Sequence, residues 1–295
     1  MRVFVTGSSA HLARTLLPRL CAHRGVAAVT GVDLRTPHFT HPLFTATQGD
    51  IRDPEIAARL AGHDALIHLA FVVLRGRMSE SEMFDINVTA SHKVFHAARA
   101  AGVKRLIHLS SAAVYGQGVH LNEDAPYAPL PGFLYGRHKA HLERLLAIEF
   151  PECVRLRPHV ILGPHAQPLL RQLLRQPCYP RLPEPQPLLQ CVHEDDAAQA
   201  VLLALERDVR GAFNLATEDN FSFRDAIRGR HRVSIPLPLA VARRGANLAW
   251  RYFGWGGEPA WIEGLTRTLL LNCRRAIVEL GWRSCHTAAQ VLAQT

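Results

Sequence analysis

The feature that most constrains the fold is an alternation, through the first half of the chain, of short β-rich runs with longer helical patterns. Such an alternation is typical of a parallel sheet with helices on both faces. Runs such as "LIHL" are apolar on both sides, as expected for strands covered above and below. We expect strands at 2–6, 26–33, 64–73, 103–111 and 153–158, with helices at 11–25, 87–102 and around 132–146.

The alternation of strand and helix patterns ends at about Pro164. The proline-rich segment 176–187 excludes a regular helix or a central strand. Segment 191–217 has the pattern of a strand end, a helix and a strand, so we expect the chain to return there to the main sheet. We therefore predict a main unit of 1–165 with the return segment 190–217. The other parts, 166–189 and 218–295, would form a smaller region.

Composition excludes several classes of protein. Hydrophobic residues make up 48% and charged residues 20%, as in an ordinary globular protein, and the six cysteines form no CxxC pair. The chain enters a strand pattern at once, and its longest apolar run is short and interrupted by His68, so we expect a cytoplasmic protein without membrane insertion. The net charge of +9 comes from scattered arginines, which argues against nucleic-acid binding.

The first predicted strand runs into the turn "TGSSAHLA". Dinucleotide-binding folds have a glycine-rich turn here, because the backbone approaches a pyrophosphate and the helix packs close to the sheet. Gly7 is present, whereas Ala10 and Ala13 occupy the two later glycine positions. The methyl group of Ala10 would face the phosphates, and the alternative is a plain strand-turn-helix without a ligand.

The second predicted strand ends in Asp33, where a carboxylate can accept hydrogen bonds from an adenosine ribose. Such a carboxylate repels a 2′-phosphate and favours NAD, although Arg35 could pair with that phosphate and leaves NADP possible. In "GDIRDP", Asp50 and Ile51 follow a short strand and could flank the adenine.

Together these segments resemble the short-chain dehydrogenase/reductase superfamily, in its extended or atypical NAD-dependent epimerase/dehydratase branch. The resemblance also includes "IHLAF", "SSAAVYG", "YGRHK", "LRPHVILGP", "VHEDDAAQA" and "RRAIVELGW". It implies a Rossmann-type doubly wound parallel sheet with a smaller C-terminal substrate-binding domain, a small-molecule substrate and a homodimer. The implied cofactor-binding residues are Gly7, Ser9, Ala10, His11, Leu12, Asp33, Arg35, Asp50, Ile51, Leu69, Ala70, Phe71, Asn87, Tyr135, Lys139, Pro158 and Val160.

The resemblance assigns Tyr135 as general acid/base, Lys139 as its partner and Ser111 as the hydroxyl that orients the substrate oxygen. Residues four apart share a helix face, so the Lys139 ammonium can lie near the phenol and lower its pKa toward neutrality. Lysine is rare here, with three copies among 34 basic residues, so its place in this motif is informative. Asn87 could order a catalytic water, but we rate an ordinary helix cap above that role.

The substrate class follows from what the motifs lack. Dehydratases of this branch carry an Asp-Glu pair where this chain has Ala112-Ala113, and nucleotide-sugar epimerases carry asparagine and arginine where it has Val160 and Leu189. The predicted lining is apolar: Phe71, Val72, Val73, Leu74, Phe133, His159 and Val160. We predict hydride transfer between NAD(P) and an alcohol or ketone on an apolar skeleton. The alternatives are a nucleotide-sugar epimerase and a non-catalytic nucleotide-binding protein.

Three further patterns have competing interpretations. His92 and His96 have metal-ligand spacing, but no third ligand is evident nearby in the sequence, so we predict no metal site there. "HEDD" at 193–196 is interpreted as a strand end and helix cap. The basic amphipathic segment 239–255 is interpreted as part of a substrate-domain helix rather than a membrane-surface contact.

Overall fold

The computed structural model describes residues 1–37, 39–253 and 260–295, and its centre is a sheet of seven parallel strands. The spatial order is β12-β7-β5-β4-β1-β2-β3. The strands are β1 (Arg2–Thr6), β2 (Ala28–Asp33), β3 (Phe44–Gln48), β4 (Ala65–His68), β5 (Arg105–Leu109), β7 (Val154–Pro158) and β12 (Gly211–Leu215). The order reverses beside β1, which is the switch point of a doubly wound Rossmann-type sheet. The predicted fold class is confirmed.

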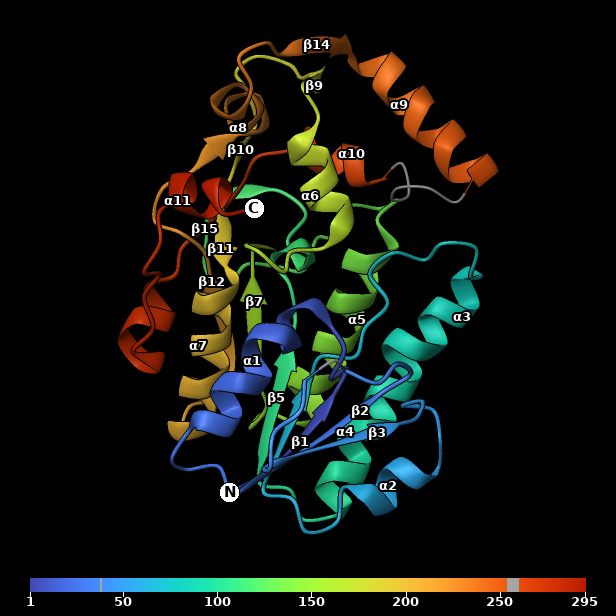
Figure 1. Ribbon diagram of the computed structural model, residues 1–295, viewed down its shortest axis with the longest axis vertical. Coiled ribbons are helices and arrows are strands. Elements are labelled where there is room, and N and C mark those ends of the chain that lie inside the picture. The colour runs from blue at the N-terminus through green and yellow to red at the C-terminus, as the bar shows by residue number, and fades with distance from the viewer. Residues whose placement is uncertain (38, 254–259) are drawn as a thin grey trace.

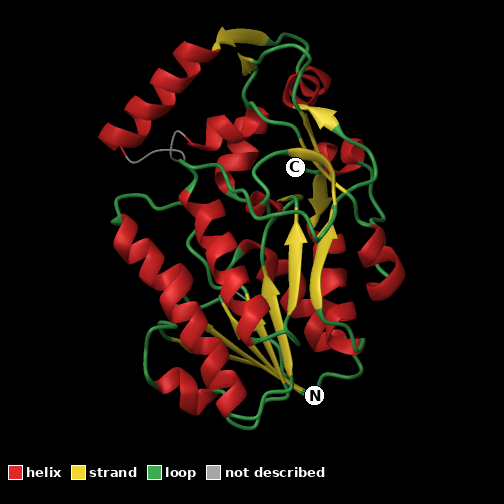
Figure 2. Ribbon diagram, turned by 180° about the vertical axis from the view of Figure 1, so that it is seen from behind, coloured by secondary structure: helices red, strands yellow, loops and turns green. Residues whose placement is uncertain are grey.

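Helices cover both faces of this sheet (Figures 1 and 2). Helices α1 (His11–Ala22) and α7 (Glu194–Glu206) share one apolar core with the strands. A second core on the opposite face contains side chains of α2 (Glu55–Arg59), α4 (Ser91–Ala100) and α5 (Leu134–Glu149). Strand β4 is buried along its whole length, as its apolar sequence predicts.

The helix before β5 begins earlier than the sequence predicts. Helix α3 (Glu80–Phe84) is capped by Ser79 and continues through a π-helical turn, Asp85–Ala90, into α4. Asn87 lies inside that turn and is fully buried, so the expectation that it caps a helix is wrong. The π-helical turn contains one residue more than an α-helical turn, which changes the direction of the side chains around it.

Smaller elements form a second layer above the carboxyl edge of the main sheet (Figure 1). Its strands are β6 (Gly118–Leu121), β8 (Val160–Leu162), β9 (Cys178–Arg181), β10 (Leu188–Leu189), β11 (Cys191–His193), β13 (Phe221–Ser222), β14 (Ile235–Pro238) and β15 (Leu269–Leu271). Its helices are α6 (Pro168–Arg175), α8 (Phe223–Arg230), α9 (Leu239–Leu248), α10 (Ala260–Leu265) and α11 (Ala288–Ala293). The proline-rich segment supplies only β9, half of a two-stranded sheet.

The return segment joins the main unit through α7 and β12, and His193 accepts a hydrogen bond from the Asp195 amide as the cap of α7. The interpretation of "HEDD" as strand end and cap is confirmed. Trp282, near the C-terminus, packs into the α1/α7 core. The boundaries 166–189 and 218–295 of the smaller region stay a prediction.

No helix among the described residues is long and apolar enough to cross a membrane. In the basic segment 239–255, helix α9 has no buried residue. The last two residues of that segment, Gly254 and Trp255, lie outside the described residues.

Candidate active site

A cavity of about 560 Å³ lies at the carboxyl edge of the main sheet, beneath the second layer. Ligands of open α/β sheets bind in this position, at the switch in strand order. Ten of its lining residues belong to the predicted cofactor set: Ala10, His11, Leu12, Arg35, Leu69, Phe71, Tyr135, Lys139, Pro158 and Val160. Ser111 lines the same cavity as Tyr135 and Lys139. The cavity therefore joins the nucleotide-type turn to the predicted catalytic residues.

The turn after β1 requires its glycine. Gly7 has φ +75°, and a Cβ there would lie 2.4 Å from the Ala70 backbone nitrogen. The turn can pack against the end of β4 only with glycine at this position. Ala10 has ordinary extended backbone angles and lines the cavity, whereas Ala13 is fully buried in the core. The two alanines thus have different surroundings, since Ala10 lines the cavity and Ala13 lies in the core.

The carboxylate of Asp33 is held at the end of β2. Its Oδ2 accepts from the Ser9 amide at 3.0 Å, and its Oδ1 accepts from the Arg35 amide at 3.0 Å. Ser9 Oγ donates to the Arg35 carbonyl at 2.5 Å, which ties the β1 turn to the loop after β2. Asp33 does not line the cavity, and its contact with a ribose stays a prediction.

The predicted adenine-flanking pair lies farther out. Oδ2 of Asp50 accepts from both Nε and Nη2 of Arg52, at 3.0 and 2.6 Å. The hydrogen bond to Arg52 holds the pKa of Asp50 below its usual range. Ile51 is buried. Gly7, Ser9, Asp33, Asp50, Ile51, Ala70 and Asn87 are the predicted cofactor residues that do not line the cavity.

The three predicted catalytic residues meet in the cavity. Ser111 caps the short 3-10 helix Ala112–Val114, and Tyr135 is the second residue of α5. Burial raises the pKa of Tyr135 to about 12, while a hydrogen bond with Ser111 lowers it. Deprotonation of this phenol in the cofactor-free protein is therefore unfavourable, so a positive charge beside it is needed for proton transfer near neutral pH.

The ammonium of Lys139 is buried close to that phenol. Its Nζ donates to the Leu109 carbonyl at 2.5 Å and lies 3.5 Å from the Phe71 ring centroid and 5.8 Å from that of Tyr135. Burial lowers the pKa of Lys139 well below its ordinary value, while the charge of Glu143, one helical turn later, raises it. The Leu109 carbonyl and the face of the Phe71 ring together hold the lysine side chain in position.

Glu143 belongs to a buried polar network behind the cavity that the sequence did not reveal. It pairs with Arg157 of β7 at 2.5 Å, and both side chains are almost fully buried. Arg157 also donates to the hydroxyls of Tyr115 and Tyr127 at 2.6 and 2.9 Å. The network anchors α5, which carries Tyr135 and Lys139, to the sheet.

An aromatic side chain of the C-terminal region, Trp261, also contacts Tyr135. The Trp261 ring of α10 is stacked with Tyr135 at 6.2 Å between centroids, and it meets Phe133 edge-on at 4.9 Å. Trp261 belongs to no recognisable sequence motif. Only its large aromatic side chain could have suggested that it contacts the active site.

The remaining walls are largely apolar. Of the seven residues predicted near the substrate, all but Val72 line the cavity. Val72 instead has both backbone groups bonded to the Asn87 amide, at 2.7 and 2.9 Å, which explains the burial of that asparagine. Further apolar lining residues are Leu130, Ile161, Leu162, Leu170, Leu173, Leu174, Leu189, Phe221, Phe223, Leu265 and Leu269.

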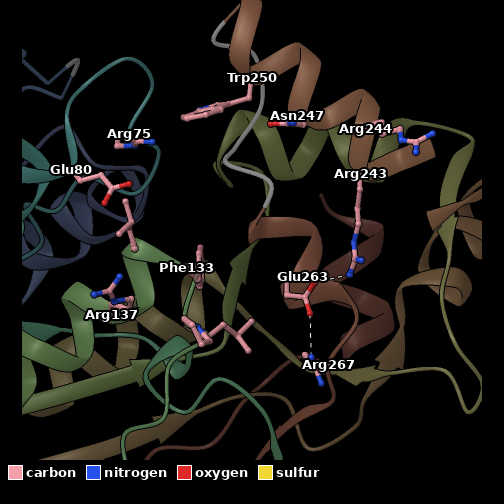
Figure 3. A pocket seen from close by; sticks show the side chains of 14 residues that line it. Arg75, Glu80, Phe133, Arg137, Arg243, Arg244, Asn247, Trp250, Glu263 and Arg267 are labelled. Carbon is pink, nitrogen blue, oxygen red and sulfur yellow. Dashed lines mark hydrogen bonds and ion pairs between the residues drawn. The ribbon is translucent and has the colours of Figure 1, made fainter. Parts of the chain in front are cut away.

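A second pocket, of about 710 Å³, adjoins the first and shares Leu130 and Phe133 with it. We call it the arginine vestibule, because its charged lining comprises Arg75, Glu80, Arg137, Arg243, Arg244, Glu263 and Arg267 (Figure 3). Glu263 pairs with Arg243 at 2.7 Å and with Arg267 at 3.2 Å. The scattered arginines of the sequence are thus partly gathered at one place, which composition alone did not show.

The sequence shows no third metal-type ligand near His92 and His96, but the fold brings one to them, and the absence of a metal site there stays a prediction. Glu149, at the end of α5, lies beside both histidines. The sequence separates it from them by more than 50 residues, so only the packing of α5 against α4 brings the three together.

A doubly wound sheet with a tyrosine, a lysine and a serine in a cavity at its carboxyl edge defines the architecture of the short-chain dehydrogenase/reductase superfamily. The family model "NAD dependent epimerase/dehydratase family" matches residues 3–216. The chain belongs to this family, and as a member it is an enzyme that uses NAD.

Individual relatives have different activities. The 4-hydroxy-2-methyl-3-oxo-4-farnesyl-3,4-dihydroquinoline-1-oxide ketoreductase of Stigmatella aurantiaca is 30% identical, over 99% of this chain and 95% of that protein. The 3-beta-hydroxysteroid dehydrogenase of Mycolicibacterium neoaurum is 29% identical, over 58% of this chain and 50% of that protein. The structure of a UDP-glucuronic acid 4-epimerase from Bacillus cereus with NAD has a TM-score of 0.76 at 18% identity, over 100% and 97% of the two chains. This last likeness concerns the fold.

Proposed function

We propose that this enzyme catalyses hydride transfer between NAD and an alcohol or ketone on a largely apolar substrate. The observation that carries the proposal is the meeting of Ser111, Tyr135 and Lys139 in a cavity whose remaining walls are mainly aliphatic and aromatic. A cavity of this kind binds an apolar body, and a few polar groups orient the reacting oxygen. The relatives named for a ketoreductase and a steroid dehydrogenase support the same substrate class.

Each of the three residues has a separate role. Tyr135 transfers a proton to or from the substrate oxygen, Ser111 donates a hydrogen bond that orients that oxygen, and Lys139 stabilises the phenolate. Bound NAD supplies the hydride-accepting ring and, in its oxidised form, a further positive charge. Because burial raises the pKa of Tyr135 to about 12, these positive charges must lower that pKa before the phenol can exchange a proton near neutrality.

The residues at the other end of the cavity fit a dinucleotide. Gly7 allows the turn to pack against the end of β4, and the first residues of the helix α1 that follows, His11 and Leu12, line the cavity. Asp33, fixed by the Ser9 and Arg35 amides, would accept from the ribose and favours NAD, while the Arg35 side chain leaves NADP possible.

The arginine vestibule supports a second candidate, a nucleotide-sugar epimerase. Val160 and Leu189 give the cavity no donors for a diphosphate, but the arginines of the vestibule could bind one just outside it. The same vestibule would also suit a carboxylate or phosphate at the far end of an apolar alcohol. Ala112 and Ala113, at the dehydratase acid/base positions, exclude neither candidate and argue only against dehydration.

The test combines cofactor binding with turnover. Binding of NAD, NADH, NADP and NADPH is measured first, and then reduction of apolar ketones and oxidation of apolar alcohols are followed through NADH absorbance. Tyr135→Phe is expected to lower kcat by about 10²–10⁴-fold while keeping NADH binding, because only the proton transfer is lost. The exposed Tyr252→Phe serves as the matched control.

The outcomes separate the candidates. Turnover of ketones that depends on Tyr135 supports the proposal. Interconversion of UDP-sugars with tightly held NAD, and no reaction with ketones, would establish the epimerase instead. Full activity in Tyr135→Phe would refute the mechanism for both.

A further inference from the structure

Three side chains outside the cavity bring ligand-type atoms to one point between helices α4 and α5. His92 Nε2 and His96 Nε2 lie 3.2 Å apart. Glu149 Oε2 lies 3.1 Å from the first nitrogen and 2.9 Å from the second. The three atoms form a nearly equilateral triangle, which we call the His-His-Glu triangle.

We propose that the His-His-Glu triangle binds a divalent transition-metal ion of the zinc class, with solvent as the remaining ligand. Tetrahedral zinc has bonds of about 2.0–2.1 Å to histidine nitrogen and carboxylate oxygen, so its ligand atoms stand about 3.3–3.4 Å apart. The observed separations are shorter by only a few tenths of an ångström. A small rotation of the side chains would therefore bring all three atoms to bonding distance.

The triangle is poorly satisfied by hydrogen bonds alone. Each neutral imidazole has one N–H and one bare nitrogen, and which ring nitrogen carries the proton is set by its partners. If both Nε2 atoms donate to Glu149, the two N–H groups stand side by side at 3.2 Å. If either is bare, its lone pair faces a carboxylate oxygen. A metal ion removes both conflicts, because all three atoms then act as donors of electron pairs to the same cation.

The helices hold the ligands before any ion arrives. His92 and His96 are one turn apart on α4, and their rings are perpendicular, with centroids 4.5 Å apart. The Phe150 ring packs edge-on against both histidines, at 6.3 and 5.0 Å between centroids.

The guanidinium of Arg99 leaves the triangle available to a cation. The Arg99 guanidinium carbon lies 3.8 Å from the centroid of the Phe150 ring. Its Nη2 also donates to the Glu149 carbonyl and pairs with Glu152 at 3.1 Å. The positive charge of Arg99 is thus shared with another carboxylate and does not occupy the Glu149 side chain.

The other histidine cluster in the described residues is already used by the protein. His193 Nδ1 accepts from the Asp195 amide as the cap of α7, and its Nε2 lies 2.9 Å from Gln294 Oε1. His286 Nδ1 faces Asp196 at 3.0 Å. Metal binding there would have to break a helix cap, so the His-His-Glu triangle is the better site.

The ion would act as a clamp between α4 and α5 rather than in the chemistry. Glu149 lies 14 residues beyond Tyr135 on the same helix, which corresponds to about 21 Å along its axis. A metal at this distance does not touch the reacting oxygen. It would instead tie the helix that carries Tyr135 and Lys139 to its neighbour, and it would stabilise the folded state by mass action.

The experiment uses the full chain, with any affinity tag removed and bound metal stripped by a chelator. Zn²⁺ affinity is measured by competition with a chromophoric chelator, and Co²⁺ absorbance reports the coordination geometry. We expect one site with a tetrahedral Co²⁺ spectrum. His96→Ala and Glu149→Gln should each weaken binding by about tenfold or more, since each removes one of three ligands.

Two control variants make the result decisive. His141→Ala removes an exposed histidine of α5 outside the triangle, and it should bind Zn²⁺ as the wild type does. His286→Ala tests the other cluster. Circular dichroism confirms that each variant is folded, and Glu149→Gln preserves the shape of the side chain. Unchanged Zn²⁺ affinity in His96→Ala, loss of binding only in His286→Ala, or no binding by the wild type would each overturn the proposal.

Discussion

Lys139 lies against the face of Phe71, with its Nζ 3.5 Å from the ring centroid. The same nitrogen donates to the Leu109 carbonyl at 2.5 Å. Because the lysine is almost fully buried, its charge depends on these two contacts and on Glu143 one turn away. A compact ammonium fits this space, whereas a planar guanidinium would need more room and more acceptors.

We therefore predict that Lys139→Arg lowers kcat/KM by roughly 100-fold or more. This factor is the lower end of what general acid/base catalysis contributes to a rate. The charge is kept in this variant, so the loss would come from the shape of the group. Lys93→Arg, at an exposed position of α4, is the matched control and should behave as the wild type. Steady-state kinetics with NADH and an apolar ketone checks both. Wild-type kinetics in Lys139→Arg would show that any cation suffices.

Ala10→Gly should tighten NADH binding, because Ala10 lines the cavity where a cofactor phosphate would approach the backbone. Ala13→Gly provides the matched control, since Ala13 is fully buried against the sheet. We expect that control to lower the free energy of unfolding by about 1 kcal/mol, the cost of glycine within a helix, and to leave NADH affinity unchanged. Equilibrium fluorescence titration measures both. An unchanged affinity in Ala10→Gly would mean that the methyl group does not contact the cofactor.

The main sheet could be predicted because its evidence is local. The predicted strand at 2–6 coincides with β1, and the predicted strand at 153–158 contains β7 at Val154–Pro158. The predicted strand at 64–73 was too long, since β4 ends at His68. Beyond it the chain stays apolar but turns into the cavity wall. Hydrophobicity alone does not distinguish a buried strand from a buried loop.

The catalytic motif could also be predicted, because its residues are close in the sequence. The residues that contact and position the motif come from distant parts of the sequence and could not be predicted. Tyr135 and Lys139 are four residues apart, and helical periodicity alone places them together. The cover by Trp261 and the pairing of Glu143 with Arg157 join distant segments. Glu149 meets His92 in the same way. Contacts of this kind depend on how helices pack on the sheet, which no spacing in the sequence records.

Trp261→Ala should raise KM for apolar substrates by roughly tenfold, equivalent to about 1.4 kcal/mol of lost binding. The reason is the stack of Trp261 on Tyr135 and its edge contact with Phe133, which together close the apolar end of the cavity. A smaller change in kcat is expected, because the tryptophan transfers no proton. Trp250→Ala is the matched control, since Trp250 lines the arginine vestibule and not the cavity. Equal effects of the two variants would argue against a specific role for Trp261.

Glu143→Gln should lower the free energy of unfolding by roughly 3–5 kcal/mol, because it leaves the buried Arg157 charge without its counterion. Arg157 and Glu143 are exposed by only 2% and 0% of their side-chain areas. Glu279→Gln is the matched control, since it removes an exposed pair with Arg275 on one helical turn and should change stability by about 0.5 kcal/mol or less. Chemical denaturation measures both. A small effect of Glu143→Gln would mean that the network can rearrange around a neutral amide.

Stability should fall in acid because several histidines are buried in the neutral form, and His68 is the clearest of them. Its Nδ1 lies 2.8 Å from Thr6 Oγ1 and its Nε2 lies 2.9 Å from Ser91 Oγ, and burial lowers its pKa from 6.5 to about 3. Between these two values the unfolded chain binds a proton at this position that the folded chain does not. The stabilising contribution is therefore complete above pH 6.5 and is lost as the pH falls toward 3.

The slope of the free energy of unfolding against pH in this window should consequently be smaller by about 1.4 kcal/mol per pH unit in His68→Asn than in the wild type, the value for one proton. His68→Asn also loses packing, so its stability is lower at every pH, and the slope rather than the absolute value is the test. His120→Asn, at an exposed position whose left-handed backbone asparagine tolerates, should keep the wild-type slope. Denaturant titrations at several pH values between pH 4 and pH 7 provide the slopes, and a single titrating group can change the slope by at most about one proton. Identical slopes for the wild type and His68→Asn would show that another group, such as the buried His108 or His159, takes up the proton.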